Sequence, residues 1–489
     1  MTGKLSEVSR DERVPEASFG GDAVSRLAEE TVNGHLLSGG MPFRVVTDSR
    51  GDVGEAIFVG LPGEKHDGSR FAEEALDRQV AGVVVGKEFW GKVKEKARRM
   101  GKAAICVADP LFFFGELARE KREKMKGTVF VGITGSAGKT TTKDMVSAIL
   151  GRAGWTFKNP GNYNNLVGLP LSLMMMREGD EYGVLEMGTN TPGEIGRLTE
   201  ILAPRVGAIT NIGPAHLEGL GDIDGVKREK GDLFEKLNAG AVAVVNEDDL
   251  RVKAVSGLFP GRKVSFGEER GDVRGKILAM NPDSMDIQLD YGEDRMNVTM
   301  ASPGVQFFSN ALCAAGIAFA LGIPKELVHD GLSSFLTGSG RFSILHPGRD
   351  VVVVDDTYNS NPLSVEVAIR NLRLMFPGRK IVFLLGDMLE LGEAADSSHL
   401  RIGGLTSSLG PHRIYTFGEL ARKIHEGALR AGYPQSQCGH FEDVEELAKR
   451  VLEDKIRGSV ILVKGSRMMK LERVVGRIVE SFSARGNGA

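Results

Sequence analysis

The sequence predicts an α/β protein with three domains, and three observations support this prediction. Apolar runs that are typical of strands alternate with helical patterns over most of the 489 residues, as in mostly parallel sheets that are covered by helices. A strand near the middle of the chain leads into a glycine-rich turn that ends in Gly-Lys-Thr, which is typical of P-loop ATPase-like folds. A further alternating block after Gly338-Ser339-Gly340 predicts a Rossmann-like, doubly wound sheet.

The N-terminal part predicts a small α/β domain. Its strands are expected at three apolar runs, 43–47, 56–60 and 82–85. Helical patterns cover 22–32 and 69–78, and the charged segment 118–126 is interpreted as a solvated helix end or a linker. We expect three domains, over residues 1–125, 126–338 and 339–489.

The rest of the chain predicts two larger sheets. The central strands are expected at 129–133, 182–186, 206–211, 241–245 and 262–266. A helix is predicted over 309–321, and Gly338-Ser339-Gly340 has the composition of a hinge. The C-terminal strands are expected at 351–354, 380–385, 413–417 and 459–463. Because open α/β sheets bind ligands at the carboxyl ends of their strands, polar residues that follow these strands are candidate functional residues.

Composition narrows the classes of function. The net charge of −3 gives no global basic field for nucleic acid or for an anionic membrane. No apolar run approaches the ~20 residues of a membrane span, and the first residues lack the apolar core of a signal peptide. Cys106, Cys313 and Cys438 lie far apart, which favours a reducing cytoplasm and no zinc site. We expect a cytoplasmic protein that acts as a monomer, with no nucleic-acid partner and no membrane span.

The glycine-rich turn predicts a nucleoside triphosphate site. Backbone N–H groups of such a loop converge on phosphate oxygens, and the following helix adds its positive N-terminal end. Lys139 would reach the β/γ-phosphates of ATP, and the Thr140 hydroxyl would ligate Mg²⁺. The predicted ATP-binding residues of the loop are Gly135, Ser136, Ala137, Gly138, Lys139, Thr140 and Thr141. The strict P-loop pattern fails by one residue, because Ile133 stands where its first glycine belongs, so a chance glycine-rich turn is the alternative.

Further polar residues stand at or just past strand ends in the central part. Glu186 ends one strand, where a carboxylate can hold Mg²⁺ directly or through water, although a surface glutamate is the alternative. His216 follows another strand, with a structural histidine as the alternative. Asn162, Asn164 and Asn165 cluster in a Gly/Pro setting, which is typical of turns but also suits recognition of a polar substrate.

Three stretches follow strands of the C-terminal part. They are 355–362, which opens on two aspartates, 385–392 and 463–467. Paired acids after a buried strand are costly to place unless they meet water, a metal or a ligand. In the central part, the composition of segment 226–234 by itself indicates only a charged helix face.

Taken in order, these stretches resemble the Mur ligase family. They are Gly-Ile-Thr-Gly-Ser-Ala-Gly-Lys-Thr-Thr, Leu-Glu-Met-Gly, Ala-His-Leu-Glu-Gly, Asp-Asp-Thr-Tyr-Asn-Ser-Asn-Pro, Leu-Gly-Asp-Met-Leu-Glu-Leu-Gly and Val-Lys-Gly-Ser-Arg, and the resemblance runs from about residue 47 to 471. The fourth and fifth stretches are most similar to the member that adds D-alanyl-D-alanine to UDP-N-acetylmuramoyl-tripeptide. The resemblance therefore implies an ATP-dependent amide ligase that acts through an acyl phosphate in peptidoglycan precursor synthesis.

The resemblance also implies catalytic and metal-binding residues. The implied catalytic residues are Lys139, Glu186, His216 and Lys230. The implied Mg²⁺ ligands are Thr140, Glu186, His216 and Lys230, the last as a carbamate. The family carries a carbamylated lysine shortly after the His-Leu-Glu stretch, and the spacing to Phe234 favours Lys230, with Lys227 as the alternative. Carbamylation would turn a cation into an anion that helps to hold a second metal.

Further implied contacts involve the two substrates. Asn310 resembles the adenine-contacting Asn of the family, and Arg341 and Asp356 resemble contacts of the last domain with ATP. The uridine nucleotide is expected at 47–50 and at 65–68. The expected substrate-binding residues are Ser49, Arg50, Asn162, Asn164 and Asn165. Gln306 and Phe307 stand where the family usually has His-Asn, so the resemblance is weaker for adenine recognition than for phosphate binding.

Two other functions stay open at this point. A sister ligase that adds a diamino acid or glutamates to a different acceptor, or a folylpolyglutamate synthetase-like ligase, would share the fold. Two features argue against these ligases: the residues of the first domain that are expected to bind the uridine nucleotide, and the Asp-Asp-x-Tyr-Asn stretch. The second alternative is an ATP-gated binding or regulatory protein without chemistry, and the presence of Lys139, Glu186, His216 and Lys230 together argues against it.

Overall fold

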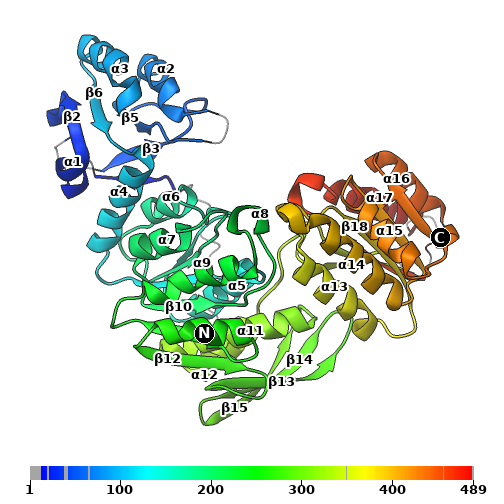
Figure 1. Cartoon of the computed structure of the whole chain (residues 1–489). Helices are drawn as coiled ribbons and strands as arrows, with labels where there is room; N and C mark the ends of the chain where they lie inside the picture. The colour runs from blue at the N-terminus through cyan, green and yellow to red at the C-terminus, as the bar shows by residue number, and fades with distance from the viewer. Residues whose placement is uncertain are drawn as a thin grey trace. The chain divides into compact units, whose positions relative to one another are not determined.

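The computed structural model describes residues 13–18, 21–37, 42–63, 66–348, 350–454, 456 and 458–486. Its strands form three sheets with helices packed against them (Figure 1). By their internal contacts the residues divide into two compact units. Unit 1 comprises Met1–Gly132, Gly154–Met187 and Arg197–Pro204, and unit 2 comprises Ile133–Ala153, Gly188–Gly196 and Arg205–Ala489.

The N-terminal sheet lies in unit 1 and has six strands in the order β1-β3-β4-β5-β6-β2. The strands are β1 (Glu16–Ala17), β2 (Ala28–Val32), β3 (Phe43–Val46), β4 (Ile57–Val59), β5 (Gly82–Gly86) and β6 (Ala103–Val107). Its main helices are α1 (Asp22–Leu27), α2 (Ala72–Asp77), α3 (Lys87–Met100) and α4 (Pro110–Lys124). Strands β3 to β6 run parallel, whereas β1 and β2 pair antiparallel at the two edges. The three predicted strands of this domain are confirmed.

The prediction of a helix over 22–32 is wrong in its second half. Helix α1 ends at Leu27, and the next five residues form β2 along the edge of β6, with Thr31 opposite Ile105. The β-branched side chains of Thr31 and Val32 fit a pleated strand better than a helix, and the pairing satisfies backbone groups at the edge of β6.

The charged segment 118–126 forms the end of α4 and the turn after it. Its interpretation as a helix end is confirmed, but its interpretation as a solvated segment is wrong. Lys121 Nζ donates to Met174 O at 2.5 Å and to Glu16 O at 3.3 Å, and Glu120 is buried where it accepts from Ala23 N. Desolvation by burial lowers the pKa of the Lys121 amine below its ordinary value. Two of these charges therefore fix α4 inside unit 1.

The central sheet has nine strands in the order β15-β14-β13-β12-β11-β10-β7-β9-β8. The strands are β7 (Val129–Thr134), β8 (Thr156–Lys158), β9 (Tyr182–Glu186), β10 (Val206–Ile209), β11 (Val242–Asn246), β12 (Arg262–Gly267), β13 (Val273–Met280), β14 (Met285–Tyr291) and β15 (Asp294–Met300). Strands β10, β11 and β12 are parallel, as are β8 and β9. All five predicted central strands are confirmed within two residues at each end.

The predicted alternation of strands and helices is wrong after β12. Strands β13, β14 and β15 follow one another directly and pair antiparallel. On β14, the alternate residues Met285, Ile287, Leu289 and Tyr291 are buried, so only one face of the strand packs inward. In such a half-buried strand only every second residue is apolar, so the sequence has no continuous apolar run. A search for apolar runs therefore misses it.

The helices of the central part are α5 (Lys139–Leu150), α6 (Gly168–Met175), α7 (Glu194–Leu202), α8 (Leu217–Leu220), α9 (Ile223–Glu235), α10 (Leu250–Val255), α11 (Val305–Ala320) and α12 (Lys325–Ser333). The predicted helix 309–321 is confirmed as α11, which starts four residues earlier. Helix α11 is apolar along most of its length and packs against α5 and β12 within unit 2. Asn310 of this helix lies beside Gly138, the N-cap of α5.

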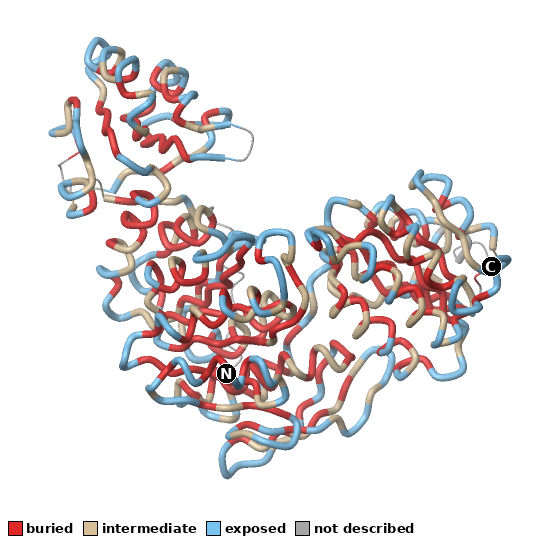
Figure 2. Tube along the Cα trace, in the orientation of Figure 1, coloured by how far each residue is buried: buried red, intermediate tan, exposed pale blue. Residues whose placement is uncertain are grey.

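The C-terminal sheet has six strands in the order β16-β17-β21-β18-β19-β20. The strands are β16 (Ser343–Gly348), β17 (Val351–Asp356), β18 (Lys380–Gly386), β19 (Arg413–Phe417), β20 (Cys438–Phe441) and β21 (Ser459–Lys464). The helices are α13 (Pro362–Met375), α14 (Ala395–Ser408), α15 (Arg422–Arg430), α16 (Val444–Glu453) and α17 (Glu472–Gly486). All pairs except β16–β17 are parallel. The inner strands β17, β21, β18 and β19 are buried between layers of helices, as Figure 2 shows in red. The predicted doubly wound sheet is confirmed.

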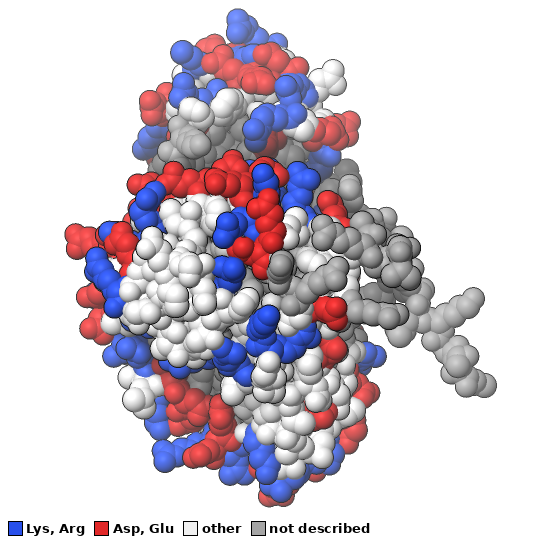
Figure 3. Space-filling model, turned by 90° about the vertical axis from the view of Figure 1, so that its right-hand side faces the viewer, with Lys and Arg blue, Asp and Glu red and all other residues white. Residues whose placement is uncertain are grey.

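Two surface properties complete the description. Within the described ranges, no helix combines the length and the apolar composition that crossing a membrane requires. On the face drawn in Figure 3, basic and acidic side chains are interspersed. This mixture agrees with a net charge of −3 made from 62 basic and 65 acidic residues.

Candidate active site

The glycine-rich loop joins β7 to α5 and is anchored on the residues that follow β10. Ser136 N donates to Asn211 O at 3.0 Å, and Ala137 N donates to Asn211 Oδ1 at 2.9 Å. Thr210 Oγ1 donates to Ala137 O at 2.6 Å, and Ser136 Oγ donates to Gly213 O at 2.8 Å. These bonds hold the loop before α5 begins at Lys139, so its remaining backbone N–H groups lie at the N-terminal end of a helix.

Two glycines of this loop cannot be replaced without a clash. Gly135 has φ 151°, and a Cβ there would overlap Thr210 Oγ1. Gly138 has φ 80°, and a Cβ there would overlap Asn310 Oδ1 of α11. The second contact shows that Asn310, predicted to bind adenine, lies beside the loop predicted to bind phosphate.

In unit 2, the positive charge of Lys139 acts on the amine of Lys230. Lys139 Nζ donates to Gly135 O at 2.8 Å. Lys230 on α9 is only 1% exposed, whereas Lys227 is half-buried. Burial, and then the positive charge of Lys139, lower the pKa of the Lys230 amine well below its ordinary value, against the opposing effect of Glu229. Such a lysine is neutral far more readily than a solvated one.

Helix α9 is not simply the charged, solvated face that its composition indicates. Glu229 is buried and accepts from Thr189 Oγ1 at 2.9 Å, from Gly193 N at 2.6 Å and from Ile195 N at 2.8 Å. These contacts tie α9 to the loop and helix start at 189–195. They hold the helix backbone next to Lys230 in place.

His216 lies at the N-cap of α8 in the left-handed conformation, with φ 54°. Its Nδ1 atom lies 2.7 Å from Glu390 Oε2, which belongs to the stretch that follows β18. Glu390 also has a positive φ, of 63°. Left-handed backbone is uncommon for residues other than glycine and is worth explaining where it occurs.

Glu186 belongs to unit 1 and ends β9, as predicted. It is buried at 3% exposure and accepts from Asn164 Nδ2 at 2.8 Å. Asn159 holds the backbone of Glu186 from both sides, because Asn159 Oδ1 accepts from Glu186 N at 2.9 Å and Asn159 Nδ2 donates to Glu186 O at 3.2 Å. The alternative of a surface glutamate is therefore wrong.

Asn159→Ala is expected to destabilise the protein and to misplace Glu186. The side chain is 1% exposed, and its loss leaves buried backbone groups without partners, at a cost of about 2–3 kcal/mol. Thermal unfolding of the variant should shift to a lower temperature, with Asn162→Ala as an exposed control. Equal melting temperatures for Asn159→Ala and wild type would contradict this role.

The remaining predicted residues of unit 1 divide between structural and accessible positions. Asn165 Oδ1 accepts from Gly168 N at 2.8 Å at the start of α6, as the turn interpretation predicts, and Asn162 is exposed. Ser49 is buried, with its carbonyl accepting from Arg78 Nη1 at 2.7 Å. Arg50 is exposed and bonds to Asp48, which lowers the pKa of that carboxyl to about 2. In the second predicted stretch, Lys65 lies outside the described residues.

In the C-terminal part, the two aspartates that end β17 are satisfied by protein groups. Asp356 Oδ2 lies 2.8 Å from Nζ of Lys464, which is buried at the end of β21. Asp355 Oδ1 accepts from Thr357 Oγ1 at 2.6 Å, and burial raises the pKa of its carboxyl. The Arg341 guanidinium stacks 4.0 Å from the centre of the Tyr358 ring. Arg341 and Asp356 are thus grouped with Tyr358 and Lys464 at the carboxyl ends of the strands.

Four residues with a structural role were not singled out from the sequence, although Glu390 and Lys464 lie inside the candidate stretches 385–392 and 463–467: Asn159, Glu229, Glu390 and Lys464. Asn159 and Lys464 stand at or just past strand ends, which is the signal that did identify Glu186. Glu229 and Glu390 acquire their roles only through tertiary contacts with 189–195 and with His216. No spacing in the sequence indicates either contact.

Gln306 and Phe307, which stand where the family usually has His-Asn, pack against other residues of the protein. Gln306 Oε1 accepts from Asn371 Nδ2 of α13, and Val305 N donates to Asn371 Oδ1 at 3.3 Å. Phe307 packs with Phe335 and Phe342, with ring centroids 6.4 and 6.3 Å apart. These two positions therefore link α11 to its neighbours.

Two of the predicted metal ligands suit Mg²⁺ by their chemistry. Thr140 offers a hydroxyl and Glu186 a buried carboxylate, and Mg²⁺ prefers oxygen ligands with some positions left to substrate phosphates. His216 adds an imidazole nitrogen, which Mg²⁺ binds less readily than oxygen. Over the described ranges, no three His, Cys, Asp or Glu side chains form a group that could hold a metal by themselves. Thr140, His216 and Lys230 belong to unit 2 and Glu186 to unit 1.

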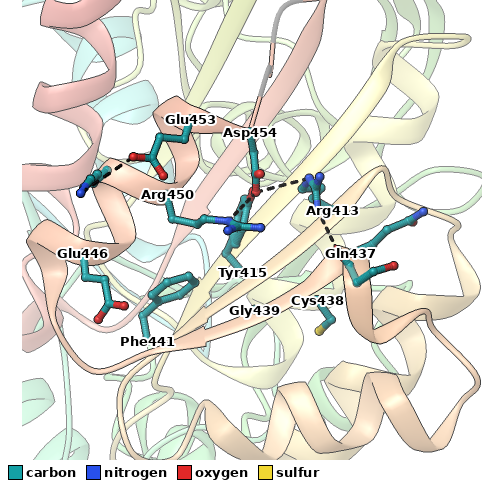
Figure 4. Close-up of a pocket in the computed structure, with 12 residues that line it drawn as sticks. Arg413, Tyr415, Gln437, Cys438, Gly439, Phe441, Glu446, Arg450, Glu453 and Asp454 are labelled. Atoms are coloured by element: carbon teal, nitrogen blue, oxygen red, sulfur yellow. Dashed lines mark hydrogen bonds and ion pairs between the residues drawn. The ribbon is translucent and has the colours of Figure 1, made fainter.

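A separate cavity of about 280 Å³ lies beside β20 in the C-terminal part. It is lined by residues of β19 and β20, by the turn before β20 and by α16. Figure 4 shows the side chains of Arg413 and Arg450 directed at Asp454, at 3.5 and 2.9 Å, and the Tyr415 hydroxyl also donates to Asp454. One carboxylate therefore contacts two guanidinium groups in this wall.

Asp454→Asn is expected to destabilise the protein by about 1–3 kcal/mol. Arg413 and Arg450 would lose their shared counter-ion in a position where the aspartate side chain is only 12% exposed. Thermal unfolding measures the change, and Glu453→Gln is the matched control, because Glu453 is exposed and 3.9 Å from Lys449. Equal losses of stability in both variants would show that the shared carboxylate is not special.

Comparisons with known proteins agree with the predicted family. Residues 133–318 match the Mur ligase middle domain, and residues 340–467 match the family described as Mur ligase, glutamate ligase domain. The UDP-N-acetylmuramoyl-tripeptide--D-alanyl-D-alanine ligase of Bacillus subtilis (strain 168) is 31% identical over 438 residues, which cover 89% of this chain and 93% of that protein.

Solved structures show the same similarity. MurF from Acinetobacter baumannii superposes with a TM-score of 0.84 at 27% identity, covering 96% of this chain and 100% of the other. MurF ligase from Thermotoga maritima in complex with ADP superposes with a TM-score of 0.78 at 28% identity, covering 91% and 98%. With two family domains matched and a relative of this identity aligned over nearly its whole length, the chain belongs to the Mur ligase family.

Proposed function

We propose that this chain is an ATP-dependent ligase that joins D-alanyl-D-alanine to UDP-N-acetylmuramoyl-tripeptide in peptidoglycan precursor synthesis. Two observations carry the proposal: the anchored glycine-rich loop that ends in Lys139, and the buried Lys230 on α9. A nucleotide switch without chemistry needs the loop but gives no reason to bury a second lysine beside it. The similarity to ligases named for this reaction supports the choice of substrates.

The proposed ATP site is built from three parts of unit 2. The loop residues Gly135 to Thr141 surround the phosphates, with Lys139 as the cation at the β/γ-phosphates. Asn310 lies next to Gly138 and is proposed to contact adenine. Arg341 and Asp356 are proposed to contact ATP from the C-terminal part. The MurF ligase structure in complex with ADP supports a nucleotide in this kind of fold.

The proposed Mg²⁺ sites use Thr140, Glu186, His216 and a carbamate on Lys230. Mg²⁺ bound there would neutralise phosphate charge and polarise the γ-phosphate. The buried position of Lys230 supports carbamate formation, because a neutral amine is the form that adds CO₂. The carbamate anion would be attracted by the positive charge of Lys139, whereas the neutral amine is not, so the neighbouring cation favours the modification.

The proposed reaction has two steps. The substrate carboxylate attacks the γ-phosphate of ATP, which gives an acyl phosphate and ADP. The amine of D-alanyl-D-alanine then attacks the acyl carbon and expels phosphate. Lys139 lowers the repulsion between carboxylate and triphosphate in the first step, since two anions must approach each other. Protein groups fixed before the reaction cost no reorganisation as charge develops, and the bonds that anchor the loop provide this fixation.

On the same basis, we propose a binding role for each of the three predicted domains. Residues 1–125 would accept the UDP moiety, with Ser49 and Arg50 at the site, residues 126–338 would hold ATP, and residues 339–489 would complete the site. Asn162, Asn164 and Asn165 would lie near the muramoyl-peptide, with Asn164 also supporting Glu186. The proposed location is the cytoplasm, which the free cysteines Cys106, Cys313 and Cys438 support.

An assay of ADP release with each candidate amine tests the choice of substrate. With UDP-N-acetylmuramoyl-tripeptide present, ADP release should depend on D-alanyl-D-alanine and not on a diamino acid or glutamate. ATP consumption that ignores the dipeptide would count against the assignment. Dependence on a diamino acid or on glutamate would favour a sister ligase instead.

A further inference from the structure

The stretch that follows β18, residues 386–392, is strongly anchored yet has no role in the proposed chemistry so far. Asp387 Oδ1 accepts from Ala421 N at 2.7 Å, and Met388 N donates to the buried ring of His399 at 3.0 Å. Leu389 N donates to Ser466 Oγ at 2.9 Å. Three successive residues are thus fixed to neighbouring elements, and the next residue is Glu390. The anchoring holds Glu390 in one place despite its positive φ of 63°.

The anchored stretch contacts the segment that carries His216. Glu390 Oε2 lies 2.7 Å from His216 Nδ1, and Glu390 O accepts from Glu218 N at 3.3 Å. Gly392 has φ 51°, and a Cβ there would lie 3.1 Å from the Cα of Glu218, so the chain passes close to α8. Both backbone and side chain of Glu390 therefore engage the His216 segment.

The chemistry of the pair indicates why this arrangement exists. A histidine that binds a metal through one ring nitrogen commonly donates its other N–H to a carboxylate, which fixes the tautomer and the ring orientation. With Nδ1 facing Glu390, the nitrogen left for a metal is Nε2. His216 and Glu390 both adopt left-handed backbone, a conformation that costs free energy and that the surrounding contacts must hold.

We propose that Glu390 is a positioning residue that orients His216 for the metal site, and this proposal rests on the proposed function. The C-terminal stretch 386–392 thereby contributes to the metal centre without touching the metal. A simpler role also fits the contact, in which Glu390 only holds its own stretch against the His216 segment and has no effect on the metal; we call this role a surface latch. The Glu390 side chain is 55% exposed, and exposed ion pairs add little stability. The two roles predict different metal affinities.

The experiment measures binding of Mn²⁺ to the full chain in the presence of ADP, by the electron paramagnetic resonance signal of free Mn²⁺. The variants are Glu390→Gly, Glu390→Gln and His216→Ala, with the double variant of Glu390→Gly and His216→Ala. Glycine suits a φ of 63°, so Glu390→Gly removes the carboxylate without backbone strain. Glu393→Ala is the matched control, because it removes an exposed carboxylate from the same segment.

Glu390→Gly is expected to weaken Mn²⁺ binding about 10-fold. Glu390→Gln keeps a side-chain oxygen beside His216 Nδ1 and should retain most of the affinity, and Glu393→Ala should match wild type. Glu390→Gly should have no further effect in the His216→Ala background, since its action passes through His216. A latch would instead leave Mn²⁺ affinity unchanged.

Each contrary result has a distinct meaning. Wild-type affinity in Glu390→Gly together with weakened binding in His216→Ala would overturn the positioning role alone. An equal loss from Glu390→Gly with and without His216 would also overturn it. If His216→Ala binds Mn²⁺ as wild type does, the metal role of His216 in the proposed function fails, and the positioning role fails with it.

Discussion

Lys139→Ala is expected to reduce ATP-dependent ligation by ~1,000-fold, which is the size of effect seen when a fixed electrostatic stabiliser is removed from an active site. The expectation follows from the position of Lys139 at the first residue of α5, after a loop held by the 210–213 segment. The loss should lie mainly in turnover, since the loop N–H groups still bind phosphate. Product formation and ATP affinity, measured on the same preparation, separate the two effects.

Lys126→Ala is the control for Lys139→Ala, because Lys126 is exposed ahead of β7. It should ligate at the wild-type rate. A nucleotide switch would respond to Lys139→Ala differently, by losing only an ATP-dependent change of shape. Full ligation activity in Lys139→Ala would contradict the proposed role of the loop.

Lys230→Ala is expected to abolish almost all turnover, with a rate ~100 to 1,000 times below that of wild type. Short carboxylic acids should restore part of the activity. The physical reason is that the variant loses the anion which a carbamate would supply at a position where Lys139 is the neighbouring cation. In wild type, removing dissolved CO₂ and bicarbonate should lower activity, and adding bicarbonate should restore it. Carbon-13 resonances from labelled bicarbonate should show a carbamate that is absent from Lys230→Ala.

Lys227→Ala provides the matched comparison on the same helix. Lys227 is half-buried and is the alternative carbamate site. If the carbamate forms on Lys230, Lys227→Ala should keep its activity while Lys230→Ala loses it. Full activity in Lys230→Ala would remove the carbamate from this account. Loss of activity in Lys227→Ala with rescue by short acids would move it to Lys227.

The sequence predicts well those parts of the protein that depend on local pattern. Continuous apolar runs such as Val351–Val354 predict buried parallel strands, because such strands are covered on both faces. Glycine spacing predicts the loop before α5, where Gly135 and Gly138 do adopt positive φ. Placement at strand ends predicts Glu186, which is indeed buried and held by Asn164.

Features that depend on distant contacts could not be predicted in this way. Strand β2 takes its conformation from pairing with β6, and β14 buries only alternate residues. The acids at 355–356 were expected to need water, metal or ligand, but buried Lys464 and Thr357 satisfy them. Glu390 meets His216 across 174 positions of sequence (390 minus 216), and nothing in either local pattern indicates that contact.

The most direct test is mass detection of the product formed from UDP-N-acetylmuramoyl-tripeptide, ATP, Mg²⁺ and D-alanyl-D-alanine. The account predicts a new species whose mass equals that of the two substrates minus one water, formed together with one ADP per product. Release of ADP without this species, or no reaction in folded protein that binds ATP, would contradict the proposal that this chain joins the two substrates.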